Sequence, residues 1–179
     1  DYAGHGSAGQ LSHEKVIALK DFSTATNTNL PLWITAACDV MPFDGVEDNI
    51  GEAAVLNANG GAVAFYGTTR TVYANRNKYM NRAFLQRVLS LKDGKPMPIG
   101  EAHRLAQNDL VLGNVIGYDS KGQPIKETDL TTNRLQYALL GDPAMPLNIP
   151  TQKVVVDSIN GIAVDGATEL PVLKAGMIA

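Results

Sequence analysis

The chain has 179 residues, a formal net charge of −3 and 18% charged side chains. This length allows one domain with a hydrophobic core and a piece of a second. The weakly acidic balance leaves no basic stripe of the kind that nucleic acid requires, and no apolar run approaches the roughly 20 residues that span a bilayer as a helix. The single cysteine, Cys38, excludes an internal disulfide and any metal site built from several cysteines.

The first part of the chain predicts two strands with a short helix between them. Residues 1–3 are typical of the last residues of a strand, so we expect an internal segment of a longer protein whose earlier strands are missing. Residues 11–20 predict the helix, with Ser12 as its N-cap. Residues 30–37 form a nearly continuous apolar run, which favours a strand covered on both faces of a sheet.

The middle of the chain alternates helical and strand patterns. The clearest helix is amphipathic, with apolar residues at helical spacing: Met80, Phe84, Val88 and Leu91. Helices are expected over residues 48–59, 78–92 and 99–112, strands over residues 62–66 and 135–140, and a polar loop over residues 118–131. The order strand, helix, strand, helix, helix, strand predicts a mostly parallel α/β sheet with helices on its faces.

The pattern changes near the C-terminus. Residues 154–159 and 162–164 are short β runs joined through Asn160-Gly161, the dipeptide favoured in two-residue hairpins. This opening of an all-β module divides the chain into a domain of residues 1–150 and the start of another, residues 151–179.

Two chemically active residues fall at one edge of the predicted sheet. His5 follows the first strand and Cys38 ends the second, and the carboxyl ends of parallel strands collect active groups. Gly4 and Gly6 flank the histidine and allow a close approach of the backbone to a ligand. The N–H groups of Gly6 and Cys38 are the expected donors to an oxyanion. A thiol beside a proton carrier predicts a cysteine peptidase, and an inert, buried cysteine remains the alternative.

Short segments in a fixed order resemble a known family. Tyr2-Ala-Gly-His-Gly6 and Ile34-Thr-Ala-Ala-Cys38 resemble the gingipain-type cysteine peptidases of the caspase–haemoglobinase clan. Within that family they are most similar to the PorU-type C-terminal signal peptidases, or sortases, of type IX secretion. The other matching segments are residues 51–52, 60–65, 69–73 and 140–143. The resemblance, over about residues 1–150, implies a caspase-like α/β sandwich followed by an immunoglobulin-like domain.

The same resemblance implies a mechanism. Cys38 would be the nucleophile that forms a thioester, and His5 the general acid for the leaving amine. The amides of Gly6 and Cys38 would hold the oxyanion. Water as the acceptor would give hydrolysis, and an amine would give transpeptidation. The resemblance further implies protein or peptide substrates among secreted cargo, contacts with secretion-system components, an extracellular position at the outer membrane and cell surface, and no cofactor.

Substrate-binding candidates follow the third predicted strand. Arg70 lies in this loop, at the same sheet edge as His5 and Cys38, and its guanidinium suits a substrate carboxylate or carbonyl. Thr69 and Tyr73 are weaker candidates in the same loop. The alternative for all three is an ordinary solvated loop position.

Other polar residues carry less information. Asp44, Glu47 and Asp48 do not have the spacing of a known calcium loop, so we expect solvated acids and no metal site, with attraction of a calcium ion as the alternative. His13 and His103 fall in helical patterns, where a solvated face is expected.

Two further functions stay open. A catalytically silent, peptidase-like scaffold could bind cargo or partner proteins, although the chain keeps both catalytic residue types. A Rossmann-like nucleotide-binding domain also fits a parallel α/β pattern. It ranks last because no G-x-G-x-x-G segment opens a helix after a strand.

Overall fold

The computed structural model describes residues 1–45, 47–111, 115–126, 130–150, 155–159 and 162–164. The chain divides into two compact units, Asp1–Asn148 and Ile149–Ala179. The first unit holds the α/β pattern and the second the short β runs near the C-terminus. No helix of the described residues is long and apolar enough to cross a membrane.

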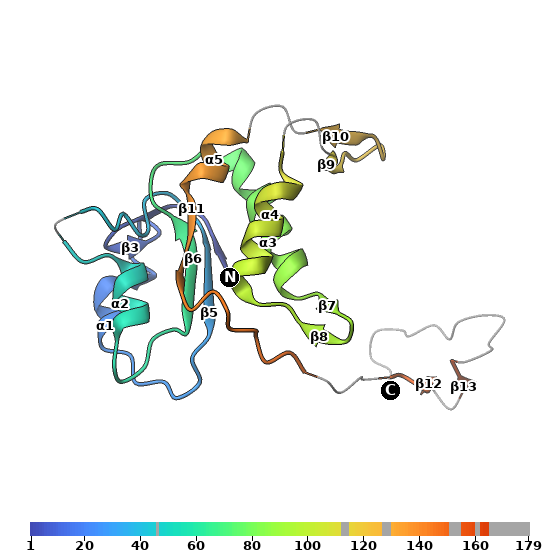
Figure 1. Ribbon diagram of the computed structural model, residues 1–179, viewed down its shortest axis with the longest axis horizontal. Helices are drawn as coiled ribbons and strands as arrows, with labels where there is room; N and C mark the ends of the chain where they lie inside the picture. The colour runs from blue at the N-terminus through green and yellow to red at the C-terminus, as the bar shows by residue number, and fades with distance from the viewer. Residues whose placement is uncertain (46, 112–114, 127–129, 151–154, 160–161, 165–179) are drawn as a thin grey trace. The chain divides into compact units, whose positions relative to one another are not determined.

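A four-stranded sheet forms the centre of the first unit (Figure 1). Its strands lie in the order β1 (Tyr2–Ala3), β5 (Leu32–Ala36), β6 (Ala64–Thr68) and β11 (Tyr137–Gly141). The first three are parallel, and β11 is antiparallel to β6. The sheet is therefore mostly parallel, as predicted.

The reversal of β11 has a simple topological cause. Two long helices, α3 (Ala74–Val88) and α4 (Ile99–Asp109), follow β6 and pack against each other. The chain leaves the carboxyl edge of β6 through α3 and returns toward the same edge through α4. Strand β11 therefore begins at the edge of the sheet where β6 ends. The N–H of Thr69, just after β6, donates to the carbonyl of Gln136, just before β11, at 2.8 Å.

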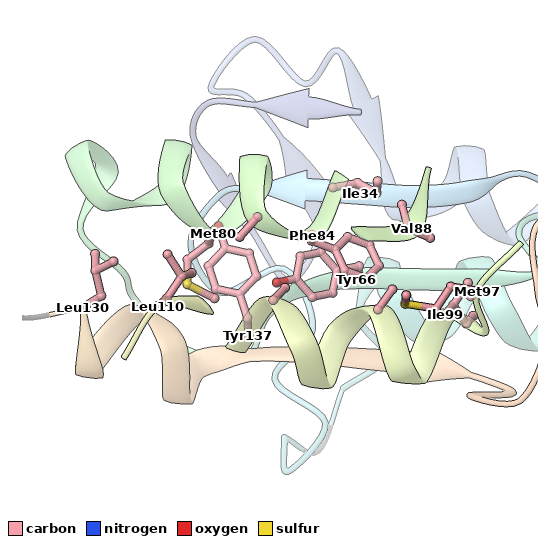
Figure 2. Packing of buried hydrophobic residues seen from close by; sticks show 14 of the residues in the cluster. Ile34, Tyr66, Met80, Phe84, Val88, Met97, Ile99, Leu110, Leu130 and Tyr137 are labelled. Carbon is pink, nitrogen blue, oxygen red and sulfur yellow. The ribbon is translucent and has the colours of Figure 1, made fainter. Parts of the chain in front are cut away.

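Helices cover both faces of the sheet (Figure 1). All of β6 is buried, and successive side chains point to opposite faces. Phe65 packs in the cluster beneath α1 (Leu19–Ser23) and α2 (Ile50–Leu56). Tyr66 packs in the cluster beneath α3 and α4, where its ring stacks on Phe84 with centroids 3.9 Å apart (Figure 2). One strand thus anchors both helical layers.

Local signals explain where two of these elements begin and end. The side chain of Asn49 caps α2 by accepting the N–H of Glu52 at 3.0 Å. After α3, the short strands β7 (Leu91–Lys92) and β8 (Lys95–Pro96) form a hairpin. Its turn residues, Asp93 and Gly94, both have positive φ (52° and 74°), as a type I′ turn requires.

Two predictions of local structure are wrong. Residues 11–20 do not form one helix: β2 (Gly6–Ser7), β3 (Gln10–Leu11) and β4 (Ile17–Ala18) form a three-stranded antiparallel sheet, and only residues 19–20 are helical, as the start of α1. Ser12, expected as the N-cap, lies between β3 and β4 with a φ of 63°. Full burial of Leu11 and pairing with β2 and β4 outweigh the local helical pattern. The polar loop expected over residues 118–131 instead contains part of the antiparallel hairpin of β9 (Val115–Tyr118) and β10 (Pro124–Lys126). It also overlaps the start of α5 (Thr131–Gln136).

In the second unit, β12 (Ser158–Ile159) pairs antiparallel with β13 (Ile162–Ala163). This agrees with the hairpin expected there, and its turn residues, Asn160 and Gly161, lie outside the described residues. The expectation of an immunoglobulin-like domain over residues 151–179 falls mainly on residues that are likewise outside them.

Candidate active site

Parallel pairing of β1 and β5 brings His5 and Cys38 together. Ala3 is in register with Ala36, and the ladder continues where the N–H of Gly4 donates to the carbonyl of Ala36 at 3.2 Å. His5 and Cys38 each lie two residues beyond the end of their strand. Both line one cavity of about 690 Å³, which we call the His5–Cys38 hollow. The edge predicted from topology therefore carries both side chains.

The glycine after His5 is required by packing against the cysteine loop. A Cβ placed on Gly6 would lie 2.7 Å from Val40 Cγ1, 2.8 Å from Ala37 Cβ and 3.2 Å from the carbonyl oxygen of Cys38. Separations this short leave no room for a side chain. The backbone that carries His5 is thus held directly against the backbone that carries Cys38.

The glycine before His5, Gly4, leaves space for the side chain of Tyr2. A Cβ on Gly4 would lie 2.6 Å from the hydroxyl oxygen of Tyr2. That hydroxyl donates to the carbonyl of His5 at 2.8 Å. Tyr2 therefore holds the backbone of His5, and Gly4 leaves room for the tyrosine ring.

Backbone geometry leaves the Gly6 N–H available as a donor. Ser7 pairs with Gln10, and the N–H of Ser12 donates to the carbonyl of His5 at 2.8 Å. The intervening pair, Gly6 and Leu11, is then the non-hydrogen-bonded pair of the ladder. Cys38 N–H also has no backbone acceptor within the described part of the chain. Both amides expected to hold an oxyanion therefore lack a backbone acceptor within the described residues, but Gly6, unlike Cys38, is not among the described residues that line the His5–Cys38 hollow.

A set of hydrogen bonds fixes the turn that follows Cys38. Asp39 has a φ of 49°, in the left-handed region. Its N–H donates to the carbonyl of Arg70 at 3.3 Å, and its carboxylate accepts the hydroxyl of Thr71 at 2.6 Å. The half-buried thiol of Cys38 points to the carbonyl of Val72, with an Sγ–O distance of 3.5 Å. The loop after β6 thus supports the cysteine from the side.

A buried polar network lies behind the hollow, and no pattern in the sequence predicted it. Asn77 is 6% exposed, and its Oδ1 accepts the Asn133 amide at 2.8 Å and the Tyr137 hydroxyl at 3.0 Å. Asn133 also bonds both the N–H and the carbonyl of Tyr73, each at 3.0 Å. Burial, with a smaller contribution from the charge of Cys38, raises the pKa of Tyr137, so its hydroxyl stays a donor. Only contacts between distant residues reveal this network.

The substrate-binding candidates after β6 lie elsewhere. Arg70 forms an ion pair with Asp44, both side chains being exposed, and the hydrogen bond from Arg70 lowers the pKa of Asp44. Thr69 donates its hydroxyl to Gln136 at 3.2 Å. Tyr73 is 57% exposed, with the Arg76 guanidinium 4.6 Å from its ring centroid. None of the three candidates is among the residues that line the His5–Cys38 hollow, although Val72 and Ala74 are.

The remaining histidines differ from each other. His13 is exposed, as expected, and lines a second hollow of about 460 Å³ that His5 shares. His103 was expected on a solvated face, but it is half-buried with its ring edge on Tyr66, centroids 5.6 Å apart. This face of α4 turns toward the sheet. Burial lowers the pKa of His103, and within the described residues its Nδ1 has no partner.

The acids near residue 44 do not form a metal site. Asp44 is engaged by Arg70. Across the residues that the structure describes, no group of three or more His, Cys, Asp or Glu side chains is placed to hold a metal ion.

Comparisons with known proteins identify the family and the fold. The model of peptidase family C25 matches residues 1–148. The fold is similar to that of a solved structure described as "Structure of Protease", with a TM-score of 0.55 and 19% identity over 83% of this chain and 35% of that one. It is also similar to the crystal structure of the Arg specific cysteine proteinase gingipain R (RGPB), with a TM-score of 0.56 and 20% identity over 82% of this chain and 32% of that one. The chain thus spans about a third of the length of each. No curated protein sequence matches it significantly.

Proposed function

Because the chain belongs to peptidase family C25, we propose that it carries the catalytic residues of a cysteine endopeptidase, with Cys38 as nucleophile and His5 as general acid. The membership and the similar protease folds make it a cysteine peptidase-like protein. The observation that carries the proposal is the shared hollow, which His5 and Cys38 reach from the ends of adjacent parallel strands.

The proposed reaction proceeds in two steps. Cys38 Sγ attacks the substrate carbonyl carbon as a thiolate, and the carbonyl oxygen, now negative, accepts hydrogen bonds from the Gly6 and Cys38 amides. The C–N bond breaks as the imidazolium of His5 gives its proton to the leaving amine, which leaves a thioester on Cys38. Water or an amine then attacks the thioester and gives a proton to the neutral His5. This restores the thiolate and the imidazolium.

The two amides are the main electrostatic contribution that this chain offers. Removal of one oxyanion donor in a comparable site costs about 10²–10³ in rate. Both donors are backbone groups, and the close packing of Gly6 against Ala37 and Val40 supports a preformed site for the oxyanion.

Within the family, we propose a PorU-like C-terminal signal peptidase or sortase that acts on secreted cargo at the cell surface. The segments Tyr2-Ala-Gly-His-Gly6 and Ile34-Thr-Ala-Ala-Cys38 support this assignment by resemblance. The proposal includes a caspase-like sandwich, an immunoglobulin-like domain from residue 151, and secretion-system components as partners.

Cleavage assays on the full-length protein test the proposal. Wild type should cleave protein or peptide substrates, and Cys38→Ala should abolish cleavage. After an acid quench, mass spectrometry should find the acyl part of the substrate on Cys38, released by hydroxylamine as a thioester is. An added amine should yield a transpeptidation product if the enzyme is a sortase. Processing that survives in Cys38→Ala would contradict the mechanism and favour a silent, cargo-binding scaffold.

A further inference from the structure

One face of α3 forms a wall of the His5–Cys38 hollow. Over about three helical turns it presents residues spaced three or four apart. These residues are Ala74, Asn77, Lys78, Asn81, Arg82 and Leu85. The polar members of this set were not singled out by the sequence pattern, and the catalytic mechanism does not use them.

Arg82 differs from the other arginines of the chain. Each of the others has a partner: Arg70 with Asp44, Arg76 with Tyr73, Arg87 with Asp109, Arg104 with Glu101 and Arg134 with Gln107. Arg82 is exposed and has no ion pair, hydrogen bond or ring contact within the described residues. Its guanidinium is therefore free to bind a planar anion at the hollow.

The charge around Arg82 is predominantly positive. Lys78 lies one turn before Arg82 on the same face, and like charges at this spacing repel each other. The Lys78 ammonium lies 4.8 Å from the ring centroid of Tyr79. No carboxylate is among the residues that line the hollow. The carboxylate of Asp1 is close to them, since it accepts the Asn81 amide at 2.9 Å, and it offsets one of the two cations.

Unused hydrogen-bonding capacity accompanies this charge. The Oδ1 of Asn81 is buried and has no partner within the described residues, but it is an acceptor and does not bind a carboxylate, and its Nδ2 already holds the carboxylate of Asp1. Asn77 commits its Oδ1 to Asn133 and Tyr137, so only its Nδ2 is left to face the hollow, as a donor. The donors that this wall offers to a carboxylate are therefore the guanidinium of Arg82, the ammonium of Lys78 and the Nδ2 of Asn77.

From this arrangement, and resting on the proposed function, we infer that Arg82 binds a substrate carboxylate and that the peptidase prefers an acidic residue at the position whose carbonyl carbon Cys38 attacks. A cationic side chain in the same hollow would meet Arg82 and Lys78. The preference would thus be opposite to that of the similar structure described as an Arg specific proteinase.

The test compares kcat/KM of the full-length protein for four peptides that differ only at this position, as Glu, Gln, Lys or Arg. Wild type should cleave the Glu peptide best. Arg82→Gln should lower the Glu-to-Gln ratio of kcat/KM by about tenfold, the effect of one partly exposed, charge-assisted hydrogen bond. Arg82→Glu should reverse the preference toward Lys and Arg. The matched control is Arg104→Gln, which removes the same charge from an exposed site on α4 and should leave the ratio unchanged.

The outcomes separate the two proposals. Cleavage that depends on Cys38 but favours the Lys or Arg peptide, or a Glu-to-Gln ratio that Arg82→Gln leaves intact, would overturn this inference and keep the peptidase. Cleavage of these peptides that persists in Cys38→Ala would instead overturn the proposed function. Because Arg82 is exposed, its variants should fold as wild type does, and their thermal unfolding checks this directly.

Discussion

Replacement of Gly6 by alanine tests the packing that joins the two catalytic loops. The added Cβ would lie 2.7 Å from Val40 Cγ1 and 2.8 Å from Ala37 Cβ, where ordinary contacts begin near 3.4 Å. The two backbones must therefore separate by about 0.7 Å, the difference between the first and last of these distances. Overpacking of this kind costs about 1–3 kcal/mol of the free energy of unfolding.

The same displacement should reduce catalysis, because the Gly6 amide moves away from the oxyanion. A misplacement of about 1 Å can cost about 10²-fold in rate, so Gly6→Ala should lose about ten- to a hundredfold in kcat/KM. Urea unfolding and peptide cleavage measure the two effects. Gly9→Ala is the matched control, since a Cβ there meets no atom within 4 Å. A fully active and stable Gly6→Ala, or equal damage in Gly9→Ala, would refute the reasoning.

Other expected outcomes follow from the polar groups around the site. Asn77→Ala removes the acceptor shared by Asn133 and Tyr137, so it should lower the free energy of unfolding by about 1–3 kcal/mol in urea titrations. Asn75→Ala, at an exposed position of the same helix, is the control and should change the free energy of unfolding little. Equal effects of the two substitutions would argue against the network. Burial lowers the pKa of His103 in the folded state, so the unfolded chain binds more protons below its ordinary pKa of about 6.5. This contribution to stability is present above that pH and is lost as the pH falls toward the folded-state pKa of His103. Thermal unfolding at a series of pH values should show this loss of stability in wild type and in His13→Gln, and a smaller loss in His103→Gln. An unchanged pH dependence in His103→Gln would contradict this assignment.

Much of the sheet could be predicted from the sequence because its strands are strongly apolar. Residues 30–37 contain β5, residues 62–66 overlap the first part of β6, and the rule that parallel strands share an edge placed His5 beside Cys38. These inferences depend on hydrophobic patterns and topology, which a single sequence carries. They needed no knowledge of individual side-chain contacts.

The errors arose where long-range pairing decides the structure. Residues 11–20 are polar and apolar in a helix-like mixture, yet β3 pairs with β2 and β4. The direction of β11 depends on the packing of α3 against α4, which local patterns do not contain. Likewise Asn77 and Asn133 resemble ordinary helix residues until the fold brings them together. Arg70 seemed available for substrate only because its partner, Asp44, is 26 residues away in the chain.

The central claim is that His5 and Cys38 act as a catalytic pair, and the pH dependence of Cys38 alkylation tests it most directly. The thiolate is the reactive form, and an ordinary thiol, with a pKa near 8.5, is almost entirely protonated at pH 6. In the full-length protein, Cys38 should react at pH 6 at least about tenfold faster than a free thiol, and His5→Ala should remove this advantage. A rate at pH 6 no greater than that of a free thiol, and unaffected by His5→Ala, would contradict the account.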